Sequence, residues 1–227
     1  MDKELLKKRA GEKAAEWIED GMLVGLGTGS TVYYFIEKLI HLCKEGLNIT
    51  VVSSSIRSFE QAQKGGIPTA NMDTVTQIDI TIDGADEIDS QKRMIKGGGG
   101  ALLREKILAN SSKEMVVIVD ESKVVEKLGK RALPVEILPF GYSATIEKIR
   151  VLGFRGEMRT TNEGKFYITD NGNYIYDIQF QELRESPEED HNRLIHIPGV
   201  LETGFFFNLA GRVLIGESSG NLKQLDK

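Results

Sequence analysis

The sequence predicts an α/β protein whose first half forms a parallel β-sheet with helices on its faces. Over that half, short apolar runs suited to buried strands alternate with amphipathic segments. The alternation stops near Gly129, beyond which turn and hairpin signals predict an α+β region. The chain has 227 residues, 40% of them hydrophobic, which suffices to bury a full core as one large or two small domains.

The elements of the first half follow from apolar spacing. A helix is expected over residues 3–20, where Leu6, Ala10, Ala14 and Trp17 form an apolar stripe. Further helices are expected over residues 31–44, 55–64 and 101–110. The compact apolar runs at residues 22–26, 49–53, 78–82 and 115–119 are typical of buried strands in a parallel sheet.

The second half mixes helices with hairpin strands. Helices are expected over residues 143–152 and 187–196, and strands around residues 154–159, 166–169, 174–180 and 201–206. The triplet Asp170-Asn171-Gly172 is a strong hairpin signal between two of these strands. A final strand at residues 212–215 is expected to return to the first sheet.

Charge and composition exclude several classes of protein. The net charge of -5 argues against a broad nucleic-acid surface, although a local basic pocket for a small anion remains allowed. Cys43 is the only cysteine, so neither a disulfide framework nor a thiolate metal cluster is expected. No apolar run approaches the roughly 18 residues of a membrane helix, and the first residues are not hydrophobic. We therefore expect a soluble cytoplasmic protein with no membrane partner.

The first chemical motif is the segment Gly25-Leu26-Gly27-Thr28-Gly29-Ser30-Thr31, which lies between a predicted strand and a predicted helix. Its glycines let the backbone approach an anion, and the helix-start amides with the hydroxyls of Thr28, Ser30 and Thr31 can donate to it. The segment lacks the third glycine of a dinucleotide fingerprint and the Gly-Lys-Ser/Thr of a Walker loop. It predicts a phosphate-binding loop, while a tight turn with a capping serine is equally typical of the pattern.

The second motif, Asp83-Gly84-Ala85-Asp86, directly follows a predicted strand. Ligands of open parallel sheets bind beyond the carboxyl ends of the strands, so both aspartates are expected to face one cavity there. A surface turn in which the aspartates bond their own backbone is the alternative. A metal site is disfavoured, because no histidine is nearby in the sequence and Lys96 would compete for the negative charge. His41, His191 and His196 are scattered and are interpreted as structural or solvated.

The third motif is Lys96 followed by four glycines, Gly97, Gly98, Gly99 and Gly100, and then by a predicted helix carrying Glu105. At 100° per residue, Glu105 lies between Ala101 and Ala109 on a small, largely apolar strip. Burial there would favour its neutral form and bring it closer to the strength of a general base. The alternative is a surface glutamate that pairs with Arg104 or Lys106.

Two further lysines are candidate phosphate ligands. Lys123 follows the predicted strand at residues 115–119, so it is also expected at the carboxyl edge of the sheet. Lys7 flanks the apolar stripe of the first helix, from which its long side chain can reach toward an anion. Both positions also suit ordinary solvated lysines.

Taken together, these motifs resemble those of the type A ribose-5-phosphate isomerases. Besides the three motifs, the resemblance includes Ser53-Ser54-Ser55, Leu-Pro-Val-Glu at residues 133–136, Thr-Asp-Asn-Gly-Asn at residues 169–173 and Ile-Pro-Gly-Val at residues 197–200. The match is colinear and spans nearly the whole chain. Any one of these motifs is weak, but their combination is highly specific.

The resemblance implies an activity and a role for each candidate residue. The reaction would interconvert ribose 5-phosphate and ribulose 5-phosphate in the pentose phosphate pathway, with no metal and no cofactor. Glu105 would be the base that moves a proton between C2 and C1 through an enediolate, with Lys96 and neighbouring glycine amides stabilising the oxyanion. Substrate contacts are expected from Thr28, Gly29, Ser30, Thr31, Asp83, Gly84, Ala85, Asp86, Gly97, Gly98, Gly99, Lys123 and Lys7. Among them, Asp83 and Asp86 would hold the sugar hydroxyls, and Asp83 would assist ring opening.

The resemblance also implies a particular architecture. A doubly wound, mostly parallel Rossmann-like catalytic domain is expected at residues 1–129 and 207–227, with an inserted ferredoxin-like α+β domain at residues 130–206 that would serve oligomerisation. A homodimer or tetramer is expected, with Phe205, Phe206 and Phe207 either at its interface or in the core. Two other functions remain open: a non-catalytic sugar-phosphate sensor and an amino-sugar-phosphate deaminase. A sensor would usually carry a DNA-binding region, and a deaminase would need a histidine near its site.

Overall fold

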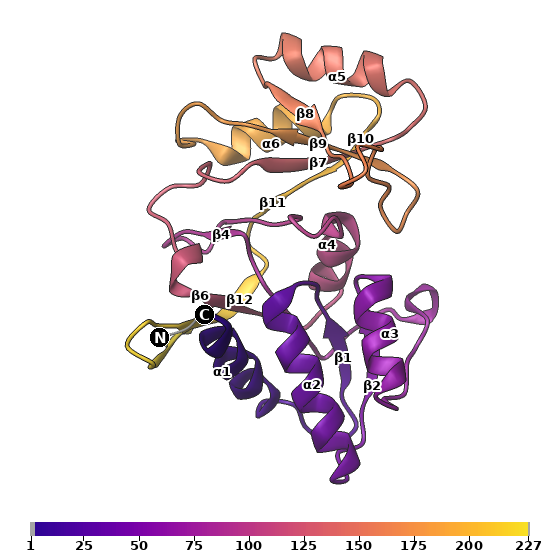
Figure 1. Ribbon diagram of the computed structural model, residues 1–227, viewed down its shortest axis with the longest axis vertical. Helices are drawn as coiled ribbons and strands as arrows, with labels where there is room; N and C mark the ends of the chain where they lie inside the picture. The colour runs from indigo at the N-terminus through magenta and orange to yellow at the C-terminus, as the bar shows by residue number, and fades with distance from the viewer. Residues whose placement is uncertain (1–2, 227) are drawn as a thin grey trace. The chain divides into compact units, whose positions relative to one another are not determined.

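The computed structural model describes residues 3–226, which form two compact units (Figure 1). Unit 1 comprises residues 3–85, Arg104–Val124 and residues 209–226. Unit 2 comprises Asp86–Leu103 and Val125–Asn208. A mostly parallel sheet lies in unit 1 and antiparallel sheets lie in unit 2. The predicted α/β class with an inserted α+β region is therefore confirmed.

Unit 1 is built on a six-stranded sheet in the order β13-β12-β6-β3-β1-β2. Its strands are β1 (Leu23–Leu26), β2 (Thr50–Ser53), β3 (Ile80–Asp83), β6 (Met115–Asp120), β12 (Ala210–Gly216) and β13 (Leu222–Leu225). All neighbours pair in parallel except β12 and β13. The last predicted strand does return to this sheet, as β12 beside β6. The edge strand β13 was not predicted, because its sequence Leu-Lys-Gln-Leu carries little apolar signal.

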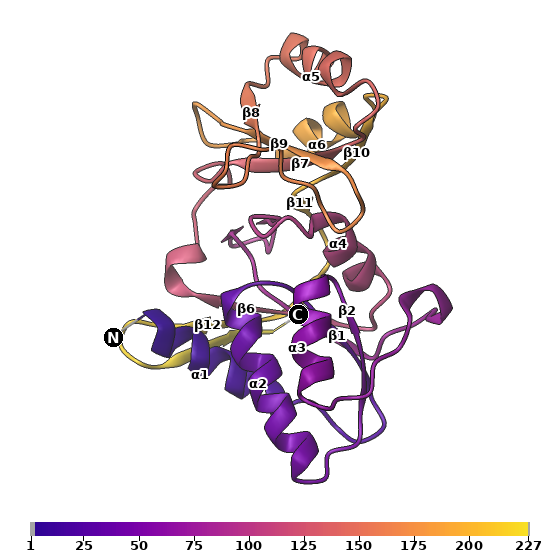
Figure 2. The same ribbon diagram turned by 45° about the vertical axis from the view of Figure 1, so that its right-hand side comes forward.

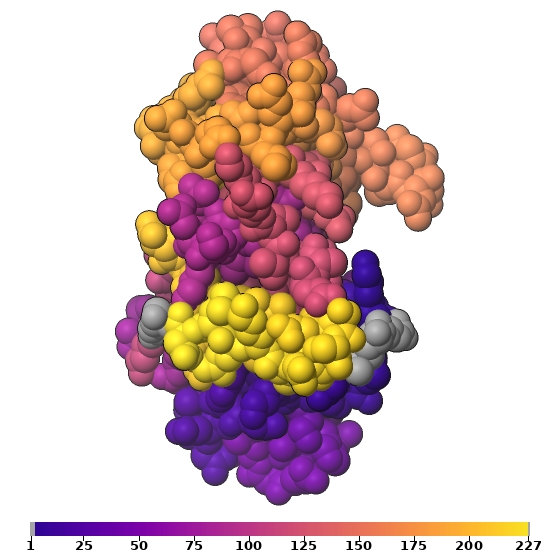
Figure 3. Space-filling view, turned by 90° about the vertical axis from the view of Figure 1, so that its left-hand side faces the viewer, coloured from indigo at the N-terminus to yellow at the C-terminus, as the bar shows by residue number. Residues whose placement is uncertain are grey.

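Helices α1 (Lys3–Ala15) and α2 (Ser30–Lys44) pack side by side on one face of this sheet (Figures 1 and 2). Helix α1 is shorter than predicted, because three successive i to i−3 backbone bonds, beginning at the Glu16 amide, tighten and end it. The helix also contacts β12, and Figure 3 shows the C-terminal segment as a band across the surface of unit 1.

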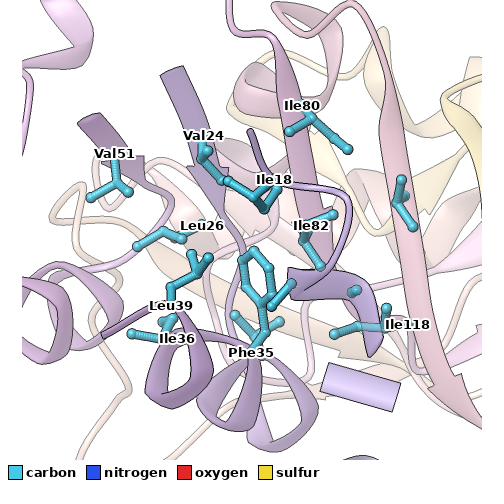
Figure 4. Packing of buried hydrophobic residues seen from close by; sticks show 14 of the residues in the cluster. Ile18, Val24, Leu26, Phe35, Ile36, Leu39, Val51, Ile80, Ile82 and Ile118 are labelled. Atoms are coloured by element: carbon cyan, nitrogen blue, oxygen red, sulfur yellow. The ribbon is translucent and has the colours of Figure 1, made fainter. Parts of the chain in front are cut away.

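The core of unit 1 lies between α2 and the sheet. Figure 4 shows Phe35, Ile36 and Leu39 of α2 together with Leu26 of β1 and Ile82 of β3 in this core. A smaller apolar cluster contains Val52 of β2, Ile78 and Leu108. Leu108 belongs to α4 (Leu102–Asn110), whose first two residues are grouped with unit 2. The third helix, α3 (Ile56–Lys64), is capped by Ser55, whose side chain accepts the Ser58 amide.

Unit 2 contains a four-stranded antiparallel sheet in the order β10-β7-β9-β8. Its elements are β7 (Leu133–Ile137), α5 (Tyr142–Val151), β8 (Gly156–Met158), β9 (Tyr174–Ile178), α6 (Pro187–Ile195) and β10 (Val200–Thr203). A second sheet in this unit has the order β11-β5-β4, formed by β11 (Phe205–Phe206), β5 (Met94–Ile95) and β4 (Glu87–Ile88). Unit 1 also contains two short 3₁₀ helices, η1 (Met72–Thr74) and η2 (Glu121–Lys123).

In the second half, one strand was missed and two predictions were wrong. No strand was predicted at β7, because a proline such as Pro134 cannot donate to a strand ladder, although its carbonyl accepts the Gly204 amide at 2.7 Å. The predicted strand at residues 166–169 makes only an isolated bridge between Thr160 and Phe166. The predicted strand at residues 201–206 is instead two strands, because β10 pairs with β7 in one sheet and β11 pairs with β5 in another.

The boundary between the units differs from the predicted one. Residues 86–103 were assigned to the first domain, but β4 and β5 pair with β11 in unit 2. The Glu87 carboxylate strengthens this grouping by accepting the backbone amides of Gly129 and Arg131. Phe205 and Phe206 are buried, so the core interpretation of these phenylalanines is the one that the structure supports. Within residues 3–226, no helix is both long and apolar enough to cross a membrane.

Candidate active site

Parallel strands of unit 1 place the first two sequence motifs at one edge of the sheet. Strand β1 ends at Leu26 beside Ile82 of β3, so Thr28 and Asp83 follow at the same carboxyl edge. The Thr28 amide donates to Oδ1 of Asp83 at 3.1 Å, and the Gly84 amide donates to the same oxygen at 2.7 Å. Asp83 is fully buried. The aspartate is thus held in place by two backbone amides.

Close packing explains the glycine that precedes Thr28. A Cβ at Gly27 would lie 2.1 Å from Cγ of Asp83, so only glycine lets the loop approach this carboxylate. A group of serines fixes the loop from the other side. The Thr28 hydroxyl lies 2.8 Å from Oγ of Ser54 and 2.9 Å from Oγ of Ser55, and Ser58 donates to the Gly27 carbonyl at 2.7 Å. No contact between this serine run and the loop was predicted, because nothing local in the sequence shows that the two segments meet.

The loop ends at the N-terminus of α2, where an anion can be bound. Gly29 is the N-cap residue with φ of 122°, and no side chain caps the helix. The first amides of any helix lack intrahelical acceptors, and the helix dipole favours negative charge beside them. Ser30 is exposed and Thr31 is half-buried, so their hydroxyls extend the set of donors. This end of α2 therefore has the chemistry of a phosphate-binding site.

Both candidate lysines of unit 1 are placed by short structural elements. Lys123 ends η2, directly after β6, and the Asp120 side chain caps this turn by accepting the Ser122 amide at 3.0 Å. Lys123 therefore lies at the carboxyl edge of the sheet, as expected from its position after the strand. Lys7 lies on α1, and its Nζ donates to Oε1 of Glu4 at 2.6 Å. This hydrogen bond lowers the pKa of the Glu4 carboxyl.

Glu105 is buried in the first turn of α4, with 4% of its surface exposed. Ala101, Leu102, Leu108 and Ala109 are the other buried residues of this segment, whereas Ile107 is exposed. The small apolar strip predicted around Glu105 is therefore present, and the surface-glutamate alternative is wrong. An acidic residue in the first turn is also favoured by the helix dipole.

In unit 2, Lys96 follows β5 and is 2% exposed. Its amide donates to the Gly204 carbonyl at 2.8 Å, which continues the pairing of β5 with β11. The Nζ atom lies 5.4 Å from the centroid of the Phe206 ring. A buried ammonium is costly unless it is compensated, and this aromatic face is one source of compensation.

The glycines after Lys96 are held on two sides within unit 2. Oδ2 of Asp86 accepts the Gly98 amide at 2.7 Å. Nη1 of Arg159 donates to the carbonyls of Gly97 and Gly98 at 2.9 and 3.1 Å. The Tyr167 hydroxyl donates to the Gly99 carbonyl at 3.3 Å, and burial raises the pKa of this phenol. Arg159 and Tyr167 were not predicted from the sequence, because nothing in their local patterns distinguishes them from other residues of a hairpin.

Groups of three or more His, Cys, Asp or Glu side chains placed to hold a metal ion do not occur within residues 3–226. The three histidines make local contacts. His41 faces Glu45 on α2, Nδ1 of His191 lies 2.8 Å from the Thr203 hydroxyl, and Nδ1 of His196 lies 2.6 Å from the Asn192 carbonyl.

A comparison with known families identifies the family of this chain. The family model described as Ribose 5-phosphate isomerase A (phosphoriboisomerase A) matches residues 50–220. The chain belongs to this family. It is 54% identical over 217 residues to the ribose-5-phosphate isomerase A of Protochlamydia amoebophila, covering 96% of this chain and 94% of that protein. It is also 50% identical over 221 residues to the Listeria innocua isomerase, covering 97% of this chain and 98% of that protein.

Solved structures of the family share the whole fold. The ribose 5-phosphate isomerase from Plasmodium falciparum superposes with a TM-score of 0.94 at 40% identity, covering 99% of both chains. A D-ribose-5-phosphate isomerase in complex with phospho-erythronic acid superposes with a TM-score of 0.94 at 38% identity, covering 100% of both chains. These matches confirm the fold and the family for the full length of the chain.

Proposed function

We propose that this protein interconverts D-ribose 5-phosphate and D-ribulose 5-phosphate, as an enzyme of the non-oxidative pentose phosphate pathway. The observation that carries the proposal is the near full-length match, at 54% identity, to a protein named ribose-5-phosphate isomerase A. In unit 1, the N-terminus of α2 suits the phosphate of such a substrate, and the buried Asp83 suits its hydroxyl groups. A cytoplasmic location would suit such a metabolic enzyme.

Glu105 is proposed as the base. Its carboxylate would take the proton from C2 of the open-chain aldose, and the electrons of that bond would form the C1–C2 double bond of an enediolate. The same proton would return to C1, while the O2 proton moves to O1, which balances aldose against ketose. The burial of Glu105 on an apolar strip supports this role, because bulk water then competes less for the transferred proton.

Lys96 and the glycine loop are proposed to stabilise the negative charge of the enediolate. Lys96 would supply a buried positive charge, which acts strongly in a medium of low dielectric constant. The Gly98 amide is bonded to Asp86, so the amides proposed to face the oxyanion are those of Gly97 and Gly99. None of these proposed roles involves a metal or a cofactor.

Asp83 and Asp86 are proposed to hold the sugar hydroxyls, with the Gly84 and Ala85 backbone beside them. Asp83 accepts the Thr28 and Gly84 amides through Oδ1, which fixes its carboxylate at the edge of the sheet, and it is the aspartate proposed to assist ring opening. An ionised carboxylate in that position can accept a hydroxyl proton.

The phosphate is proposed to bind at the start of α2. Ser30 and Thr31 would donate through their hydroxyls and amides, and Gly29 would let the phosphate approach the backbone. The Thr28 hydroxyl already bonds Ser54 and Ser55, so its proposed part is to shape this loop. Lys123 and Lys7 would add positive charge, Lys7 by moving from its ion pair with the exposed Glu4.

A direct assay tests the function. Purified protein supplied with ribose 5-phosphate is expected to produce ribulose 5-phosphate, followed by a coupled assay or by the ketose absorbance. Binding of the sugar phosphate without turnover would favour the sensor. Release of ammonia from an amino-sugar phosphate, with no isomerisation, would favour the deaminase. A deaminase would need a histidine near its site, and His191 and His196 instead make local contacts.

Replacing Lys123 by alanine is expected to raise KM for ribose 5-phosphate about 10-fold with little change in kcat. Phosphate binding persists from the ground state to the transition state, so its loss is uniform and appears in KM. The matched control is Lys113→Ala, because Lys113 precedes β6 at the opposite edge of the sheet and pairs with Asp79. A Lys123→Ala variant with the KM of the Lys113→Ala control would remove Lys123 from the phosphate site.

Homo-oligomerisation through unit 2 is proposed on the basis of the family resemblance. Several large apolar side chains of this unit are exposed, of which Phe140 is the extreme at 88%. Whether a dimer or a tetramer forms would follow from the mass of the protein in solution.

A further inference from the structure

A continuous set of polar contacts in unit 2 runs from Asp177 on β9 through Arg159 to the glycine loop. Nε and Nη2 of Arg159 bond the two carboxylate oxygens of Asp177 at 2.8 and 2.6 Å, in a bidentate pair. The third nitrogen, Nη1, is left for the loop and donates to the carbonyls of Gly97 and Gly98. The side chain of Arg159 is 16% exposed, so these bonds are shielded from water.

Because the peptide bond is planar, a hydrogen bond to a carbonyl also fixes the direction of the amide in the same peptide, and Arg159 does this for two peptides. A carbonyl oxygen and the amide hydrogen of the same trans peptide point in opposite directions. Arg159 bonds the oxygen of the Gly97–Gly98 peptide, whose amide on the far side donates to Asp86. Arg159 also bonds the oxygen of the Gly98–Gly99 peptide, so the Gly99 amide is turned away from Arg159. Within residues 3–226, this Gly99 amide donates no hydrogen bond.

The surrounding backbone reinforces this orientation. Gly100 has φ of 84°, and its amide donates to the Gly97 carbonyl at 2.9 Å. A Cβ at Gly100 would lie 2.4 Å from the Tyr167 hydroxyl oxygen, so Tyr167 packs directly on the loop. The guanidinium carbon of Arg159 lies 5.8 Å from the centroid of the Tyr167 ring. The loop therefore has little freedom to rotate its peptides while Arg159 is in place.

We propose that Arg159, fixed by Asp177, is a positioning residue for isomerisation. It orients the Gly98–Gly99 peptide so that the Gly99 amide can donate to the oxyanion. It also orients the Gly97–Gly98 peptide so that the Gly98 amide holds Asp86. The proposal rests on the proposed function, since it assigns the support of that same site. Hydrogen bonding of a charged guanidinium to both carbonyls also polarises the two peptides, which strengthens their amides as donors. Arg159 itself need not touch the substrate.

The test compares two arginines of unit 2 that form the same kind of ion pair. Arg184 bonds both carboxylate oxygens of Asp190 at 2.6 and 2.9 Å, and within residues 3–226 it has no hydrogen bond to the glycine loop. Both Arg159→Ala and Arg184→Ala lose a bidentate pair, so both are expected to lower the melting temperature. Only Arg159→Ala is expected to lower kcat, by about 10- to 100-fold, because a misplaced donor acts mainly in the transition state. Its KM is expected to rise by a smaller factor, about 3-fold, through the weaker hold on Asp86.

Two further measurements separate positioning from folding. Guanidinium ions added to Arg159→Ala are expected to restore part of kcat, whereas the same ions leave the kcat of Arg184→Ala unchanged. Arg159→Lys keeps the charge but cannot bond Asp177 and two carbonyls together, so an intermediate kcat is expected even if the alanine variant folds poorly. The proposal would be overturned if Arg159→Ala and Arg159→Lys had the same kcat as Arg184→Ala. Wild-type protein that fails to isomerise ribose 5-phosphate would instead overturn the proposed function.

Discussion

Replacing Glu105 by glutamine is expected to lower kcat by about 10²- to 10⁴-fold while KM stays similar. Glutamine keeps the size and most of the packing of the glutamate on α4, but its amide cannot accept the proton from C2. Glu105 is 4% exposed, so water has little room to replace the missing base. Steady-state kinetics with ribose 5-phosphate measure both constants, and loss of deuterium transfer from C2 to C1 of a substrate labelled at C2 would give a second reading.

The control for this variant is Glu114→Gln. Glu114 is another glutamate of unit 1, and its carboxylate bonds Arg212 at 3.1 and 2.8 Å. Its loss is expected to cost stability but to leave kcat near the wild-type value. Near-normal turnover by Glu105→Gln would end the assignment of the base, whatever the control does.

Replacing Lys96 by methionine is expected to lower kcat by about 10²- to 10³-fold, comparable to the loss of an oxyanion donor. Methionine is unbranched and apolar, so it can fill the buried space beside Phe206 while removing the positive charge. The loss is expected in kcat, because the charge of the enediolate develops only as the reaction proceeds.

Lys130→Met provides the comparison for Lys96, because Lys130 is an exposed lysine of unit 2. Its kcat and KM are expected to stay within about 2-fold of the wild type, as is usual for an exposed position. A Lys96→Met variant that raises KM and keeps kcat would assign Lys96 to ground-state binding instead. Thermal unfolding of both variants would show whether the buried position tolerates methionine.

The order of the elements in unit 1 was predictable because each has a strong local signal. Apolar runs such as residues 115–119 form buried strands, and the stripe containing Leu6, Ala10 and Ala14 forms a buried helix face. The signals were weaker in unit 2. Strand β7 was not predicted, although it accommodates Pro134. Residues 166–169 have an apolar alternation but make only an isolated bridge. Local patterns cannot show which strands find a partner, because pairing depends on distant segments.

The candidate residues were predictable to a similar degree. Asp83, Lys96, the four glycines and Glu105 are unusual together in a short segment, since buried charge and glycine both cost free energy of folding. The burial of Glu105 followed from its helical position between Ala101 and Ala109. The roles assigned to these residues still rest on the family resemblance.

What the sequence alone determined was the fold class, the family and the crowding of acids, glycines and a lysine into residues 83–105. The tertiary structure decided which distant side chains hold those residues in place. Ser58 supports the Gly27 carbonyl from 31 residues away, and Arg159 supports the Gly97 carbonyl from 62 residues away. It also decided that residues 86–103 join unit 2. Hydrogen bonds across such separations leave no local periodicity in the sequence, so only the folded chain reveals them.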